Sequence, residues 1–458
     1  MASIIESPEL TPSDLLVLQN LARDIRNRRP VSSTVPSDTG KSTGTSTLPV
    51  LKPKYANGDA THKACNGPAG DRDNKGDIAT LKALNEPKCQ DFEPTVFSSW
   101  DLRDLKSRLP PAVYRNILRP YMSWAMKVAR FETDVVMVTH LILHFTISLP
   151  SALWLFYRFT YLHGVLHILL QGWSIGSYTL LRHQHIHQRG VLSKRSWMQV
   201  FDYVFPYVMD PLMGHTWNSY FYHHVKHHHV EGNGPNDLSS TVRYQRDDIW
   251  HFLLYVGRFY FFVWLDLPLY FVRTNRWTLA LRVAFWELSN YAAISFLLMY
   301  NFKPALFTLL IPLLLMRLGL MVGNWGQHAF VDADEPDSDY RSSITLIDVP
   351  SNRYCYNDGY HTSHHLNPLR HWRDHPVHFL ESKETYSREH ALVFHNIDYL
   401  MITVRLMMRD YEHLARCLVP IGDQIDMTME QRVAMLKRHT RRFSEEEIRE
   451  KFGVAKGK

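Results

Sequence analysis

The 458-residue chain contains 26 histidines, and several stand at spacings that suit metal binding. The first group is the stretch 183–187, with the sequence HQHIH. On an α-helix, residues four positions apart share a face, so His183 and His187 would point the same way while His185 points elsewhere. Neutral imidazoles paired in this way are common metal ligands.

Two later groups repeat a spacing of three and then four residues, which also places their members on one helical face. The run 223–229 (HHVKHHH) supplies the first set: His224, His227 and His228. The run 361–365 (HTSHH) supplies the second: His361, His364 and His365. Because His223 also stands four residues before His227, the register of the earlier run stays open. We expect His185 and His229 to lie outside the metal's immediate ligands.

A fourth pair, Asn324 and His328, shares a face at the end of an apolar segment. Nine histidines and one asparagine are too many for one zinc ion, which takes four ligands, but suit two metals with five or six ligands each. Imidazole binds Fe, Cu, Ni and Zn alike, so the pattern alone does not name the metal. Because the chain contains no Glu-x-x-His sequence, a carboxylate-bridged di-iron helical bundle is disfavoured.

Two other histidine pairs have the same spacing: His140/His144 and His163/His167. We predict that they pack against neighbouring helices or lie at the outer membrane–water interface instead of binding metal. On a continuous helix, the second pair would lie roughly 24–36 Å from the first metal-binding group. It is therefore too distant to join a compact metal cluster.

The elements that must position these groups are long apolar segments. Four of them, at about 134–157, 159–181, 279–300 and 304–323, are each long enough to cross a bilayer core, which needs about 20 residues. The loop 182–251 is rich in Arg and Lys and is therefore predicted to be cytosolic. If 252–272 also crossed, the segment after 323 would reach the opposite side, so we predict that 252–272 lies in the interface or re-enters.

The sequence thus predicts an all-α integral membrane protein with two transmembrane hairpins (four spans), an interfacial helix and a helical cytosolic cap holding the metals. We expect a disordered N-terminal tail over 1–92 with one short helix after Ser13, because 31–75 is rich in Ser, Thr, Pro, Gly and Asp. A cytosolic lead-in over 93–133, a membrane domain over 134–400 and a cytosolic helical tail over 401–458 follow.

The amino-acid composition argues against several other classes of protein. The net charge of +6 is mild, and no basic run is interleaved with aromatic residues, so nucleic acid is not an expected partner. The four cysteines form no CxxC pair, which argues against a disulfide framework or a thiolate metal site. The N-terminus has no pattern typical of a cleaved signal peptide.

The order HxxxH, HxxHH, HxxHH, with paired apolar spans between the second and third groups, resembles the membrane fatty acid desaturase and hydroxylase superfamily over about 93–372. The lead-in 97–121 (FSSWDLRDLKSRLPPAVYRNILRPY) is similar to that of acyl-lipid desaturases, whereas Asn324-x-x-x-His328 resembles stearoyl-CoA-type enzymes. The sequence departs from the family pattern in two places. The first group contains the extra His185, and the second group is embedded in a run that contains five histidines. The HPGG motif of a fused cytochrome b5 domain is absent.

The resemblance implies two iron ions held by these ligands: His183, His187, His224, His227, His228, Asn324 (through water), His328, His361, His364 and His365. It also implies O₂, an acyl-lipid or acyl-CoA substrate, a separate electron donor of the cytochrome b5 and reductase type, and residence in the endoplasmic reticulum with both termini cytosolic. Trp217, Tyr220 and Trp325 are candidate substrate contacts, although aromatic residues near a membrane surface are commonly anchors.

Desaturation of an acyl chain is the predicted reaction. Hydroxylation on the same scaffold is the nearest alternative, because the outcome depends on substrate placement that the histidine groups do not encode. A metal transporter with histidine-rich loops is the alternative from another class. Such a protein should carry ionisable ligands at mid-membrane, whereas these groups lie at the ends of the spans.

Overall fold

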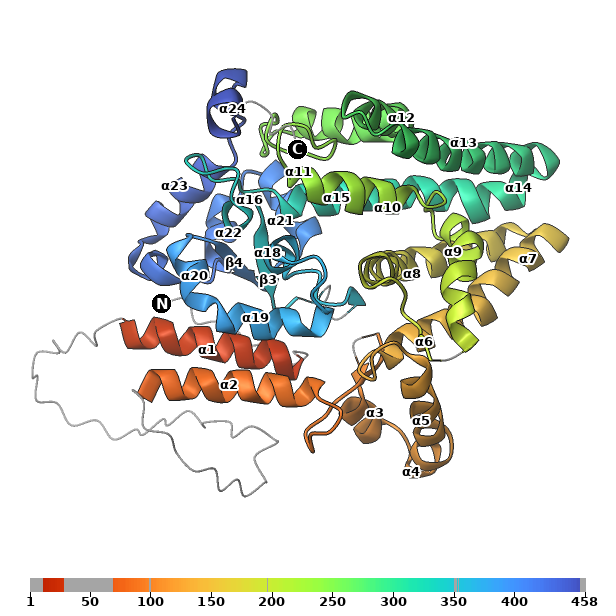
Figure 1. Cartoon of the computed structure of the whole chain (residues 1–458), viewed down its shortest axis with the longest axis horizontal. Helices are drawn as coiled ribbons and strands as arrows, with labels where there is room; N and C mark the ends of the chain where they lie inside the picture. The colour runs from red at the N-terminus through yellow and green to blue at the C-terminus, as the bar shows by residue number, and fades with distance from the viewer. Residues whose placement is uncertain are drawn as a thin grey trace, which may run out of the picture.

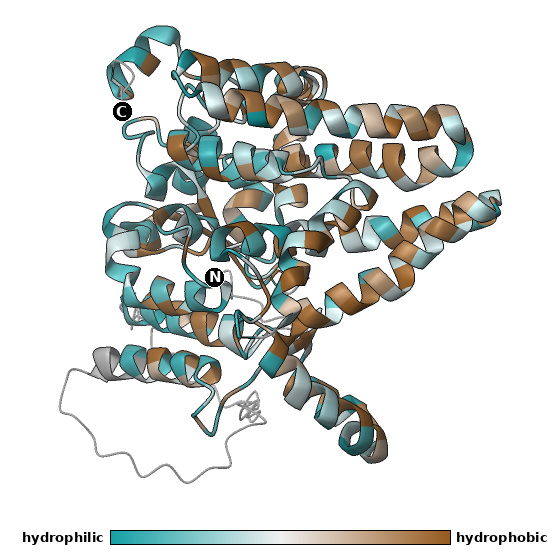
Figure 2. Cartoon of the chain, turned by 45° about the vertical axis from the view of Figure 1, so that its right-hand side comes forward, coloured by the Kyte–Doolittle hydropathy of each residue, from teal (hydrophilic) through white to brown (hydrophobic). Residues whose placement is uncertain are grey.

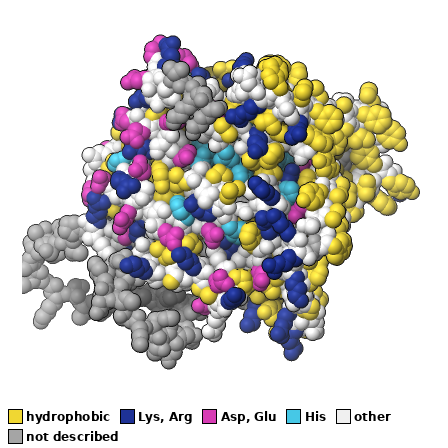
Figure 3. Space-filling view, viewed as in Figure 1, with side chains coloured by type: hydrophobic (Ala, Val, Ile, Leu, Met, Phe, Trp, Pro, Cys, Tyr) yellow, Lys and Arg dark blue, Asp and Glu magenta, His cyan; other side chains and the backbone are white. Residues whose placement is uncertain are grey.

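The computed structural model describes residues 11–28, 69–98, 100–195, 197–349, 352 and 354–453, and most of them are helical (Figure 1). Long helices extend to one side of the molecule and shorter helices form the other. Hydropathy colouring shows the same division, because the extended helices are mostly brown and the compact part mostly teal (Figure 2). In the space-filling view, apolar side chains cover the extended side (Figure 3).

Five long helical runs make up the apolar part: α6–η2–α7 (Val135–Tyr157), α8 (Tyr161–Gln188), α12 (Ile249–Arg273), α13 (Trp277–Tyr300) and α14–η5–α15 (Phe302–Gln327). Among the described residues, three of them are long and apolar enough to cross a membrane: Val135–Tyr157, Ile249–Arg273 and Phe302–Gln327. The predicted spans 159–181 and 279–300 do form helices, α8 and α13. Polar side chains such as Gln171 in α8 and Glu287 in α13 make these two helices less apolar.

The tips of the two helical hairpins meet at the end of the molecule that is remote from the polar part. The ring of Phe159, between α7 and α8, lies 5.4 Å from that of Phe307 in η5. The ammonium group of Lys303 in α14 lies 5.2 Å from the ring centre of Tyr161. The opposite ends of α8 and α15 carry histidines, so the hairpins present their histidine-bearing ends to the polar part.

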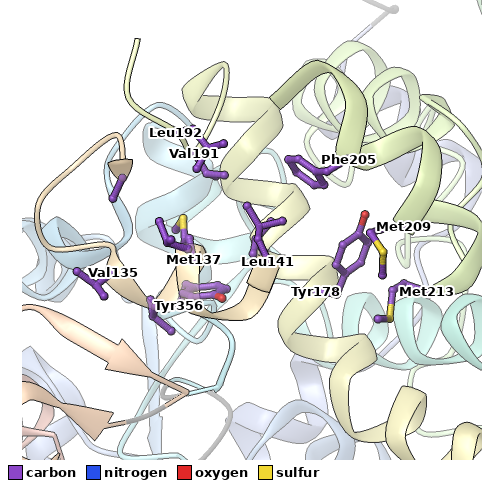
Figure 4. Close-up of a cluster of buried hydrophobic side chains, with 14 of the residues drawn as sticks. Val135, Met137, Leu141, Tyr178, Val191, Leu192, Phe205, Met209, Met213 and Tyr356 are labelled. Carbon is purple, nitrogen blue, oxygen red and sulfur yellow. The ribbon is translucent and has the colours of Figure 1, made fainter. Parts of the chain in front are cut away.

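The lead-in segment joins the membrane helices to the polar part. It comprises the antiparallel pair β1 (Thr95–Phe97) and β2 (Trp100–Asp101), then α3 (Leu102–Arg108), α4 (Pro111–Val113), η1 (Tyr114–Leu118) and α5 (Arg119–Val128). After α5, Ala129 forms a β-bridge with Leu192. A shared apolar core then joins α6, α8 and α9 (Val200–Leu212), with Leu141, Tyr178 and Phe205 among its members (Figure 4).

The polar part surrounds a parallel two-stranded sheet of β3 (Ile344–Ile347) and β4 (Leu392–His395), whose residues are all buried. The helices after the first histidine groups are α10 (Ser219–His223), η4 (His224–His228) and α11 (His229–Glu231). Those around the sheet are α16 (Asp339–Ser342), α18 (His361–Leu366), α19 (His375–Glu381) and α20 (Lys383–Arg388). The C-terminal ones are α21 (Tyr399–Met407), α22 (Tyr411–Cys417), α23 (Met429–His439) and α24 (Glu445–Lys451). The short 3₁₀ turns are η3 (Trp197–Gln199), η6 (Trp372–Asp374) and η7 (Gly422–Asp426).

The range 1–92, predicted to be a disordered tail, contains two helices. The helix expected after Ser13 is α1 (Pro12–Arg28), and the second is α2 (Ala69–Asn85), which was not expected. Leu18 of α1 and Leu81 of α2 are buried with Phe379 of α19 in one core cluster. A few leucines at helical spacing are therefore enough to order a polar segment when they can pack against an existing apolar surface. This packing corrects the prediction of disorder for the segment that forms α2. Residues 1–10 and 29–68 lie outside the described residues.

Gly326 fixes the close approach of α15 and α21. A Cβ added to Gly326 would lie 2.6 Å from the carbonyl oxygen of Tyr399. We therefore expect Gly326→Ala to lower the free energy of unfolding by about 1–3 kcal/mol through overpacking. The measurement is the melting temperature of the purified protein in detergent. The matched control is Gly257→Ala in α12, where no atom lies within 4 Å of the added Cβ. Equal melting temperatures for the two variants would contradict this account of the packing.

Candidate metal centre

Nine histidines converge where α8, η4 and α11, α15 and α18 meet. The first group contains His183, His187, His224, His229 and His364, and the second contains His228, His328, His361 and His365. Within each group, the ligand atoms all lie within 4.8 Å of one another. The two groups are adjacent, because the ring centres of His229 and His365 are 5.3 Å apart.

Ring nitrogens in the first group approach one another closely around a common point. The Nε2 atom of His364 lies 3.0 Å from that of His183 and 2.9 Å from that of His229. The Nε2 atoms of His229 and His224 are 3.1 Å apart. Two nitrogens bound to one metal at about 2.1 Å are themselves separated by about 3.0–3.4 Å. The spacing is therefore that of ligands around a shared ion.

The second group has the same geometry. The Nε2 atom of His361 lies 3.2 Å from that of His328 and 3.0 Å from that of His365. His328 follows the last residue of α15, and His361 and His365 occupy successive turns of α18. A membrane helix and a helix of the polar part thus share one site.

Hydrogen bonds on the outer ring nitrogens orient two ligands of the second group. The Nδ1 atom of His228 lies 2.6 Å from an Asp237 carboxylate oxygen, and His328 Nδ1 donates to the carbonyl oxygen of Ser342 at 2.7 Å. A proton held on Nδ1 leaves Nε2 as the metal-binding nitrogen. Burial alone would raise the pKa of the Asp237 carboxyl, but His228 and His227 outweigh burial and hold that pKa well below its usual range.

The protonation state of the buried imidazoles also suits metal binding. Burial, reinforced by the neighbouring imidazoles, lowers the pKa of His224, His229 and His364 well below 6.5. These rings are therefore neutral at pH 7 and present a lone pair. The Nε2 atom of His187 is buried and has no hydrogen-bond partner within the described residues. A buried, unpaired nitrogen is costly unless a metal or water satisfies it, so the residues present fit a metal centre.

A π-helical turn changes which members of the second histidine run face the centre. The sequence pattern assumed an ordinary α-helix and selected His227, but residues 224–228 form η4, a π-helix. The wider turn brings His224, His228 and His229 to the inner face. His227 instead accepts a hydrogen bond from the Leu238 amide through Nε2 and packs on Tyr270. His229, expected to lie outside, joins the first group in place of His227.

The remaining histidines of the sequence pattern lie apart from both groups. His185 contacts Arg182 through Nδ1 and the carbonyl oxygen of Asp202 through Nε2. Both His163 and His167 contact the hydroxyl of Ser151. His140 contacts the Tyr356 hydroxyl.

Asn324 lies beside the second histidine group. Its amide donates to the carbonyl oxygen of Ser239 and to the Tyr255 hydroxyl, at 2.8 Å and 2.7 Å. These bonds hold the side chain at the wall of a cavity that His228 and His361 also line. A ligand role for Asn324 through water stays a prediction.

The cavity beside the metal centre has a volume of about 230 Å³ and is mostly apolar. Of the three predicted substrate contacts, Tyr220 lines it, with its ring stacked 5.2 Å from that of His224. Trp217 lies elsewhere and donates to the carbonyl oxygen of Tyr207. Trp325 is fully buried beneath α12 and donates to the carbonyl oxygen of Arg246. Sequence reasoning missed Phe259 and Met316, which also line the cavity.

A helical membrane-type scaffold with nine clustered imidazoles defines the chain as a candidate histidine-ligated metalloenzyme. The model of the fatty acid desaturase family matches residues 159–396, which is more than half of the chain. The chain therefore belongs to the fatty acid desaturase family. The matched range includes all nine histidines. No curated protein and no solved structure matches the chain in the comparisons.

The exchange of His227 for His229 is testable by metal analysis of the purified protein. We expect His229→Ala to lower the metal content, because it removes a nitrogen from the first group. His227→Gln should retain the wild-type metal content, because its amide oxygen can still accept the hydrogen bond from Leu238. Metal loss that is greater for His227→Gln than for His229→Ala would contradict the π-helical register.

Proposed function

We propose that the chain introduces a carbon–carbon double bond into a fatty acyl chain in an O₂-dependent reaction at a histidine-ligated di-iron centre. The observation that carries this proposal is the pair of adjacent imidazole groups at one end of an apolar cavity. Iron bound there supplies the oxidising power for removing hydrogen from an unactivated methylene, using O₂ and two electrons from an external donor.

The protein's part is to hold the acyl chain against the centre and keep water away. Phe259, Met316 and Leu320 provide apolar walls, and Tyr220 lies against a histidine of the first group. Gly319 and Gly323 also line the cavity, and no atom lies within 4 Å of a Cβ added to either. These glycines leave space for a ligand along one face of α15. Holding the reacting carbon in one position supports reaction at a fixed bond.

We propose that four helices cross the bilayer and that α12 lies along its cytosolic surface, although α12 is long enough to span. Contacts at both ends of α12 support this orientation. Near its start, the Gln245 amide donates to His251, and Arg409 pairs with Asp247. Near its end, the Tyr270 hydroxyl donates to Glu231, which lies two residues after the second histidine run. Both ends thus meet the polar part of the molecule.

The proposed setting is the endoplasmic reticulum membrane, with the metal centre and both termini on the cytosolic side. The substrate is an acyl lipid or an acyl-CoA, and a separate donor of the cytochrome b5 and reductase type provides electrons. The absence of an HPGG motif supports a separate donor, since that motif accompanies a fused one.

Expression in a lipid-competent host followed by mass spectrometry of the acyl chains tests the reaction. We expect products two mass units lighter than the substrate. His364→Ala should abolish them and lower the iron content, because His364 Nε2 approaches both His183 and His229. His163→Ala is the matched control and should retain activity, since His163 contacts Ser151 and lies outside both groups. Products sixteen units heavier would indicate hydroxylation, and equal behaviour of the two variants would contradict the ligand assignment.

A further inference from the structure

A buried ion pair joins two of the apolar helices. The Arg317 guanidinium in α15 donates to Glu287 Oε1 in α13 at 2.6 Å, and the two side chains are 9% and 4% exposed. The Tyr291 hydroxyl donates to the same carboxylate oxygen. Charged groups are rare within membrane helices, and they commonly mark functional sites. Apolar side chains would often join two helices equally well, so stability alone gives little reason for this pair.

The pair lines a small cavity that adjoins the cavity beside the metal centre. The small cavity has a volume of about 40 Å³ and also contacts His215 and Thr216. Five residues line both cavities: Tyr220, His223, Phe259, Met316 and Leu320. These shared walls place the ion pair at a cavity directly beside the one that the histidine groups line.

The ion pair does not use all of its hydrogen-bonding capacity. Glu287 Oε2 and Arg317 Nε make no hydrogen bond within the described part of the chain. A carboxylate accepts hydrogen bonds and a guanidinium donates them, so this cavity is complementary to a ligand group that both donates and accepts a hydrogen bond.

We propose that Glu287 and Arg317 form a polar subsite that selects acyl chains carrying a hydroxyl group remote from the bond that reacts. The hydroxyl donates to Glu287 Oε2 and accepts from the Arg317 guanidinium, while the apolar part of the chain occupies the adjoining cavity beside the metal centre. This inference rests on the proposed acyl substrate and narrows its class. An unsubstituted chain would leave the two charged groups facing hydrocarbon.

Binding can be measured without turnover. The purified full-length, iron-loaded protein in detergent is titrated with saturated C18 fatty acids that carry one hydroxyl at successive positions, and with stearic acid. The readout is the shift in melting temperature, from which the ratio of dissociation constants is obtained. We expect at least one hydroxy acid to bind about tenfold more tightly than stearic acid, because a site built for a hydroxyl disfavours the analogue that lacks it.

The discriminating variant is Glu287→Leu/Arg317→Met, which replaces the pair with apolar side chains of similar size. It should lose the preference, giving a ratio near one. The matched control is Arg258→Gln/Asp266→Asn, which removes the ion pair of α12 and should retain the preference, since neither residue lines the two cavities. If wild type binds no hydroxy acid more tightly than stearic acid, or if the apolar variant keeps the preference, the inference is overturned. Because this readout requires no reaction, a protein that binds hydroxy acids selectively but forms no double bond would contradict only the proposed function.

Discussion

The convergence of imidazole nitrogens from four separate segments is the constraint on which the rest of the structure depends. Uncharged rings that meet at about 3 Å gain little from one another, whereas a shared cation gives each nitrogen a bonding partner. Two long helices, α8 and α15, must end at the same level for their histidines to meet those of η4, α11 and α18. The hairpin contacts between Phe159 and Phe307 help to set that level from the opposite end.

The polar part maintains this convergence by holding the outer sides of the rings. Asp237 and the Ser342 carbonyl orient His228 and His328, so that their remaining nitrogens point inward. The close packing of Gly326 against Tyr399 anchors the end of α15 two residues before His328. These contacts couple the folding of the polar part to the geometry of the histidine groups, and they explain how residues far apart in sequence come together in one place.

The sequence predicted a large part of this arrangement. Three- and four-residue spacings identified eight of the nine clustered histidines. Five of these lie on the regular helices α8 and α18, where periodicity maps directly onto a face. The spacing pointed to His227, whereas His229 lies in the cluster, because η4 contains a π-helical turn that no local pattern distinguished from an α-helical one. The approximate positions of the apolar helices also followed from length and hydropathy. Helix α2 did not, because its order depends on tertiary contacts such as Leu81 with the α19 cluster.

The most direct test of the central claim is iron analysis combined with X-ray absorption spectroscopy of the purified protein. The account predicts two irons per chain, each bound mainly by imidazole nitrogens at about 2.1 Å, with a nearby second iron. A single metal with four ligands, or two irons without imidazole coordination, would contradict it.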